Sequence, residues 1–204
     1  MERRSRARNL TSKANSENVE EMLFESGLGA NGKYKKFADY VLCDDNRVAF
    51  EKAKKWMPNW KEGKLGLLFY GPAGTGKTHL AESLLYSWIT SREVFGLFLP
   101  TIKIPRNDSD ALIRLMEPDE VPILVLDDLG AEKLTERSLE CTYSIISERL
   151  RLGGPIIATT NYLPRKGENS LVEKYGDEYG DRIVGRIREA CQLVPVGGED
   201  RRFA

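Results

Sequence analysis

The stretch GPAGTGKTHLAESLL, residues 71–85, carries the motif that decides the fold. Its beginning, GPAGTGKT, matches the pattern GxxxxGK(S/T) and stands between an apolar, strand-like segment (65–70) and a helix-like segment running from Thr78 to about Ser91. Glycines in such a loop let backbone N–H groups turn toward phosphate oxygens, and the positive end of the next helix adds to the attraction. We therefore expect a nucleotide-binding loop made of Gly71, Pro72, Ala73, Gly74, Thr75, Gly76, Lys77 and Thr78, with His79 beside it. For His79, packing or solvation explains the position better than proton transfer.

Two acidic residues follow the most convincing strand of the sequence, VPILVLDDLG at 121–130. Four apolar residues place Asp127 at the carboxyl end of a buried strand, which is the edge where open α/β sheets bind ligands. Thr78 and Asp127 are therefore the expected Mg²⁺ ligands, while Lys77 would neutralise charge on the β and γ phosphates. Asp128 could orient or deprotonate an attacking water. Two adjacent acids after a strand could also form a simple turn.

Polar residues end the next apolar strand, PIIATTN at 155–161. Thr160 or Asn161 would emerge at the same edge, where an uncharged amide could hydrogen-bond the γ phosphate or the attacking water. Strands also end in Asn simply because Asn turns well. The position after the acidic strand favours Asn161 as a functional residue.

A pair of arginines lies four residues apart in GDRIVGRIREA, 180–190. In a helix that begins near Asp181, Arg182 and Arg186 share one face. They could be solvated surface or pair with nearby glutamates. Alternatively, one could reach a neighbouring subunit's site as an arginine finger, where its fixed charge stabilises the γ phosphate.

The alternation of apolar strands with amphipathic helices predicts an α/β fold with a parallel sheet flanked by helices. The remaining strands are expected at 94–100 and 192–196, and the remaining helices at 108–116, 135–152, 170–176 and 181–190. A further helix is expected in the second half of 33–60, ending before Pro58.

The composition has 31 Lys and Arg against 31 Asp and Glu, so the whole chain lacks the basic excess typical of nucleic-acid binding. Residues 1–13 are locally basic, which suggests an arm that touches phosphate backbones or an acidic partner, or else a plain solvated tail. No apolar run approaches the ~18 residues of a membrane span, and no apolar core follows the basic start. Three cysteines far apart in the sequence indicate neither a zinc site nor a disulfide framework. We therefore expect no membrane association and a cytoplasmic location.

These elements, in this order, resemble the DnaC/IstB branch of the AAA+ ATPases, which comprises bacterial and phage helicase loaders and the ATPases that assist certain transposases. The similarity covers about Lys33 to Arg202 and is strongest at YGPAGTGKTHLA, LVLDDLGAEKLTE, SIISERL, ATTNY and GDRIVGRI. The resemblance implies a P-loop NTPase (AAA+) domain over 33–204. The polar, basic composition before it predicts a flexible segment over 1–32. Because the chain stops soon after Arg188, we expect no C-terminal helical lid.

The resemblance also implies roles for particular residues. It makes 71–78 the Walker A loop, Asp127 and Asp128 the Walker B acids, Asn161 the sensor 1 residue and Arg186 the arginine finger. KYKKFADYV resembles the segment that contacts the adenine base, so Tyr40 and Val41 are candidates for that contact.

The function implied is that of an ATPase with ATP and Mg²⁺ as cofactors. Such proteins form homo-oligomers with ATP between subunits and engage single-stranded DNA, and loaders hold a replicative helicase. We expect a helicase loader, with an IstB-like transposition helper as the alternative. Only about thirty residues precede the similarity, fewer than the helicase-binding domain usual in loaders, which weakens the loader interpretation without favouring the helper. A small-molecule kinase and a protein that binds ATP only as a structural ligand remain as rivals. The basic arm and the Arg165–Lys166 loop are the only candidates for DNA contact.

Overall fold

The structure is a computed structural model that describes residues 18–29, 33–57 and 65–201. The strands are β1 (Gly66–Tyr70), β2 (Gly96–Pro100), β3 (Ile123–Leu129), β4 (Ile156–Thr160) and β5 (Cys191–Pro195). The helices are α2 (Asp44–Trp56), α3 (Lys77–Arg92), α4 (Ser109–Met116), α5 (Glu136–Leu152), α6 (Leu171–Tyr175) and α7 (Asp177–Ala190), with short 3-10 turns η1 (Phe37–Asp39) and η2 (Thr101–Lys103). Each expected strand and helix is present, although α7 begins four residues earlier than the sequence suggested.

The five strands pair in parallel in the order β2-β3-β4-β1-β5. Strand β4 lies between β1 and β3, so the carboxyl ends of these three strands are neighbours. The phosphate loop follows β1, the acidic pair ends β3 and the TTN segment ends β4. The topology therefore brings three segments that are distant in sequence to one edge of the sheet, as expected for an α/β parallel sheet.

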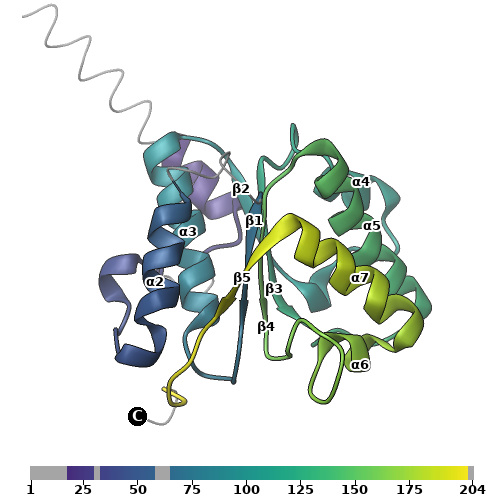
Figure 1. Ribbon diagram of the computed structural model, residues 1–204. Helices are drawn as coiled ribbons and strands as arrows, with labels where there is room; N and C mark the ends of the chain where they lie inside the picture. The colour runs from purple at the N-terminus through teal and green to yellow at the C-terminus, as the bar shows by residue number, and fades with distance from the viewer. Residues whose placement is uncertain (1–17, 30–32, 58–64, 202–204) are drawn as a thin grey trace, which may run out of the picture.

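Helices cover both faces of the sheet (Figure 1): α2 and α3 lie on one side, and α4 to α7 on the other. Alternate strand residues enter the two cores. Leu67 and Phe69 pack on the α3 side, whereas Leu68 packs on the α5 side. This double burial explains why the strands read as unbroken apolar runs.

Residues 18–29 pack against the α3 side of the sheet. Residues 18–25 are helical, and Leu23 and Leu28 are buried in the same core as Leu67. The backbone N–H of Phe98 in the edge strand β2 donates to the carbonyl of Ser26 at 2.7 Å. Part of the segment expected to be flexible thus covers a strand edge. The basic arm, 1–13, lies outside the described residues, and the domain boundaries stay a prediction.

After β5 the chain returns to the phosphate loop. The backbone N–H of Arg201 donates to the carbonyl of Gly74 at 3.2 Å. Within the described ranges no helix follows β5, and none of the helices there is long and apolar enough to cross a bilayer.

Candidate functional site

The phosphate loop joins β1 to α3 and depends on glycine at two positions. Gly74 and Gly76 have φ values of 76° and 96°, in the left-handed region that side chains disfavour. A Cβ on Gly76 would also lie 3.0 Å from the Tyr40 ring. The Thr75 hydroxyl and the Lys77 ammonium both donate to the carbonyl of Pro72, at 3.0 and 2.6 Å. The loop is therefore curled around its own carbonyl, with the buried Lys77 at the helix start.

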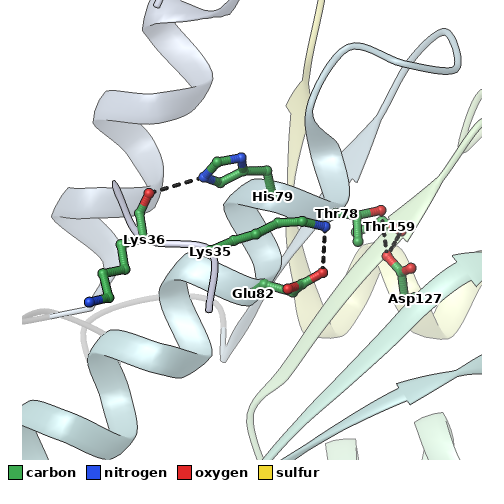
Figure 2. A network of polar contacts seen from close by, with 7 residues as sticks. All are labelled: Lys35, Lys36, Thr78, His79, Glu82, Asp127 and Thr159. Carbon is green, nitrogen blue, oxygen red and sulfur yellow. Dashed lines mark hydrogen bonds and ion pairs between the residues drawn. The ribbon is translucent and has the colours of Figure 1, made fainter. Parts of the chain in front are cut away.

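The two expected metal ligands are in contact. The Thr78 hydroxyl donates to Oδ1 of Asp127 at 3.0 Å, and the Thr159 hydroxyl donates to the same oxygen at 2.7 Å (Figure 2). Burial raises the pKa of Asp127, the two threonine hydrogen bonds oppose this, and the neighbouring Asp128 charge adds to it. A hydroxyl and a carboxylate converging from α3 and β3 are the oxygen ligands that Mg²⁺ takes beside phosphates.

An irregularity in β3 aims both acids at the same side. The register with β4 shifts between Leu126 and Leu129, and Asp128 has a φ of 63°. Without this bulge, successive side chains would point to opposite faces. The left-handed conformation costs a non-glycine residue about 1 kcal/mol, although aspartate tolerates it better than most residues.

Polar contacts hold the Asp128 turn toward β4. Its backbone N–H donates to the Thr159 hydroxyl at 2.8 Å, and the Asn161 side-chain amide donates to its Oδ1 at 3.0 Å. Asp128 and Asn161, each expected at this edge of the sheet, therefore meet, but Thr160 does not join them. Thr160 is buried and donates to the carbonyl of Leu129 at 2.7 Å.

These side chains surround a cavity of about 300 Å³. The cavity is lined by Lys35, Ala73, Gly74, Gly76, Lys77, Thr78, His79, Asp127, Asp128, Thr159 and Asn161. Its volume is at the lower end of the range for small-ligand sites. The residues fit a magnesium nucleotide: a glycine loop at a helix N-terminus, a lysine, a hydroxyl and two carboxylates.

Sequence reasoning missed two of the lining residues. Thr159, near the end of β4, donates its hydroxyl to Asp127 of β3. Whether this threonine or its neighbour makes the contact depends on the register of β4 against β3. Lys35 reaches the cavity from the segment before η1, and its ammonium pairs with Glu82 of α3 at 2.7 Å (Figure 2). Only the basic run KYKK indicated a cation there.

Tyr40 and Val41 do not line this cavity. Tyr40 is buried beneath the loop, where its ring stacks on Phe50 and its hydroxyl lies 3.4 Å from the carbonyl of Thr75. Val41 is exposed. His79 contacts the carbonyl of Lys36 at 3.0 Å and packs edge-on against Tyr40, so it ties the segment before η1 to α3. The adenine contacts stay a prediction.

Arg186 lies away from this cavity, whose lining includes no residue of α7. Its guanidinium pairs with Glu189, one turn along the same helix, at 3.0 Å. Arg182 stacks over the Tyr143 ring of α5, with its guanidinium carbon 4.4 Å from the ring centre. The shared exposed face is confirmed, while Ile183 and Ile187 are buried. The finger role stays a prediction.

Comparisons with known proteins place this site in a family. The sequence model of the IstB-like ATP binding protein family matches residues 57–204. The replicative helicase loader DnaI of Bacillus subtilis is 24% identical over 181 residues, which cover 81% of this chain and 58% of DnaI. An ATP-binding protein of a Mycobacterium tuberculosis insertion sequence is 28% identical over 111 residues, which cover 52% of this chain and 44% of that protein. The chain thus spans about half the length of these curated relatives.

A solved structure extends the likeness to three dimensions. The crystal structure of the DnaC helicase loader is 26% identical, superposes with a TM-score of 0.63, and is matched over 82% of this chain and 99% of that chain. The resemblance to the DnaC/IstB branch is confirmed. The chain also has the AAA+ fold. The family model matches most of the length of this chain, including the phosphate loop and the two acids, so the chain belongs to the IstB-like ATP-binding protein family.

Proposed function

We propose that this protein is an ATP-hydrolysing helicase loader of the DnaC type, which delivers a replicative helicase during DNA replication. The observation that carries the hydrolysis is the bulged end of β3, where Asp127 and Asp128 both line a cavity with Lys77 and Asn161. The loader assignment draws on the likeness to DnaI and DnaC.

In this proposal each side chain has one task. Lys77 leaves the Pro72 carbonyl to neutralise the β and γ phosphates. Thr78 and Asp127 would hold Mg²⁺, which would neutralise charge on the phosphates. Asp128, steadied by the amide of Asn161, orients the attacking water and accepts its proton.

The site is completed by a second copy of the chain. Arg186 is exposed and contacts only Glu189 of its own helix and Tyr143 of α5 among the described residues, so it can exchange these partners for a γ phosphate of the neighbouring subunit. ATP between subunits would then control how the protomers sit against one another and against single-stranded DNA. For DNA contact the candidates are the basic arm and the Arg165–Lys166 loop; Lys166 pairs with Asp181 at 2.6 Å.

A mixing experiment tests the shared site. Arg186→Ala is expected to lower ATP turnover by roughly 100-fold, the scale for removing a group that stabilises transition-state charge. Lys77→Ala should also be inactive, because it cannot hold the phosphates. Mixing the two variants should restore turnover, since the first keeps an intact loop and the second keeps an intact arginine.

The matched control is Arg47→Ala, which removes an exposed arginine paired with Asp44 within one turn of α2. It should leave turnover unchanged. Turnover that is independent of protein concentration, or that Arg186→Ala does not affect, would contradict the shared site.

A transposition helper is the second candidate, because the family model is named for IstB and one relative belongs to an insertion sequence. Affinity capture on the wild-type chain with ATP, in parallel with Lys77→Ala, separates the two. A replicative helicase retained by the wild type and lost by the variant would support the loader. A transposase retained without helicase would support the helper.

A further inference from the structure

Glu132 is a buried carboxylate that lies outside the nucleotide cavity. The residue as a whole is 2% exposed to solvent. One oxygen, Oε2, accepts from the backbone N–H of Gly130 at 2.8 Å and from the Thr101 hydroxyl at 3.2 Å. The other, Oε1, accepts from the Tyr175 hydroxyl at 2.9 Å. A buried carboxylate is tolerated only when donors satisfy it, and here they come from three separate segments.

Two of these donors belong to the Asp128 turn or touch it. Gly130 follows Asp128 by two residues. The Thr101 hydroxyl also lies 2.9 Å from the carbonyl of Asp128, so its single hydrogen is shared between that carbonyl and Glu132. The backbone N–H of Ala131 donates to the same carbonyl at 3.0 Å. Glu132 thus supports the turn without lining the cavity.

This support matters because of the conformation of Asp128. Its positive φ is disfavoured for a side-chain-bearing residue and persists only when the surroundings impose it. The direction of the carboxylate depends on that φ. Relaxing the turn would re-aim Asp128 away from Asn161 while leaving the phosphate loop untouched.

The third donor connects the turn to the arginine-bearing helix. Tyr175 ends α6, and only Gly176 separates it from α7. Burial, followed by the Glu132 charge, raises the pKa of Tyr175 well above its ordinary value, so the hydroxyl remains a donor at neutral pH. Through Tyr175, Glu132 therefore holds the start of the helix that presents Arg186.

We propose that Glu132 is a positioning residue for ATP hydrolysis: it fixes the Asp128 turn through Gly130 and Thr101 and couples that turn to α7 through Tyr175. The inference rests on the proposed ATP hydrolysis. A shift of α7, as when Arg186 enters a neighbouring site, would be transmitted to the Asp128 turn through two hydrogen bonds, from Tyr175 to Glu132 and from Gly130 to Glu132.

Turnover and nucleotide affinity separate positioning from mere stability. In the full chain, at a temperature where each variant is folded, Glu132→Ala should lower kcat by on the order of 10- to 100-fold. The Kd of a fluorescent ATP analogue should stay within about twofold, because the loop is intact. Glu132→Gln should recover most of kcat, since its amide oxygen can accept from Gly130 and its NH₂ can donate to Tyr175.

Tyr175→Phe isolates the coupling to α7. It should lower kcat several-fold with an unchanged Kd, and combined with Glu132→Ala it should cost no more than Glu132→Ala alone, because both act through one network. Ser26→Ala, which removes a buried hydroxyl on the other side of the sheet, is the control and should not change kcat. If Glu132→Ala does not fold, Tyr175→Phe decides alone: an unchanged kcat overturns the coupling.

Amide hydrogen exchange over residues 128–131 reads the turn without any turnover. Faster exchange there in Glu132→Ala and in Tyr175→Phe, with exchange of the loop 71–78 unchanged, supports the positioning role. Wild-type exchange, or a loss of kcat matched by a loss of affinity, overturns it. A wild-type protein without turnover refutes the proposed hydrolysis, and the exchange result still decides whether Glu132 holds the turn.

Discussion

Two regions of the molecule hold their functional side chains in different ways: the edge of the sheet at the carboxyl ends of β1, β3 and β4, called here the phosphate edge, and the exposed face of α7. At the phosphate edge, contacts join residues far apart in sequence: Thr78 meets Asp127, and Asn161 meets Asp128. On α7, Arg186 is bound to Glu189 three residues away on the same helix. The first set joins separate strand ends to the start of α3, whereas Arg186 pairs within one helical turn and also contacts Tyr143 of α5 on the exposed face.

The difference indicates which half of the site is prepared in one chain. Side chains held by the fold lose little freedom when a ligand arrives, so their geometry is set before binding. An exposed ion pair within one turn contributes little stability and is easily exchanged. The loop and acids therefore form a preorganised nucleotide site, whereas the arginine is free to change partners.

The largest expected effect is on nucleotide affinity. Lys77→Ala removes a buried ammonium that would contact two phosphates, so the Kd for ATP should rise by roughly 100-fold. Arg186→Ala, measured on dilute protein by titration calorimetry, should leave the Kd within about twofold. An equal loss of ATP affinity in the two variants would show that both regions bind nucleotide within one chain. It would contradict the distinction between a prepared site and an arginine that serves the neighbouring subunit.

Much of the phosphate edge could be predicted from the sequence because its residues stand at strand ends, and parallel strands deliver their ends to one edge. The register of β4 could not be predicted, and it decides that Thr159 rather than Thr160 contacts Asp127. The left-handed backbone conformation of Asp128 could not be predicted either, since it depends on a bulge of β3 against β4.

Other misses have the same physical origin. Tyr40 is aromatic and precedes the core, but whether it faces a base or a loop depends on the packing of Phe50 and Gly76 around it. Glu132 reads as one acid in a polar turn, and only the arrival of Tyr175 and Thr101 makes it a buried acceptor. Local pattern indicates what a residue can do, and non-local packing decides what it touches.

A smaller effect concerns the charge of Asp127 in the nucleotide-free protein. Its pKa is raised by burial, so over the window between the ordinary and the raised value the folded state holds more protons than the unfolded state. The free energy of unfolding therefore falls as the pH rises through that window. Asp127→Asn should raise the Tm at pH 7.5 and change it less at pH 4.

With Mg²⁺ and ATP the order should reverse, because the wild type gains an ion that the variant holds poorly. Thermal melts of both proteins, with and without nucleotide, check the sign. Asp119→Asn, at an exposed loop position, is the control for removing one negative charge. A variant that melts below the wild type without nucleotide would mean that the Asp127 carboxylate stabilises the empty site.

The smallest expected effect is a titration on the α7 face. The nearby Ser147 hydroxyl, followed by the guanidinium groups of Arg182 and Arg186, lowers the pKa of Tyr143 to about 8. The tyrosine ¹³Cζ resonance, assigned by its loss in Tyr143→Phe, should therefore titrate near this value. Arg182→Ala and Arg186→Ala should each raise the pKa toward 10, because the anion loses a donor.

Tyr143 can thus report where Arg186 is. If a nonhydrolysable ATP analogue brings protomers together and Arg186 leaves for the neighbouring site, the pKa of Tyr143 should rise in the wild type. It should stay constant in Lys77→Ala, which cannot hold the analogue. A wild-type pKa that does not move at concentrations where the protein assembles would mean that Arg186 keeps its local partners, and that another residue completes the site between subunits.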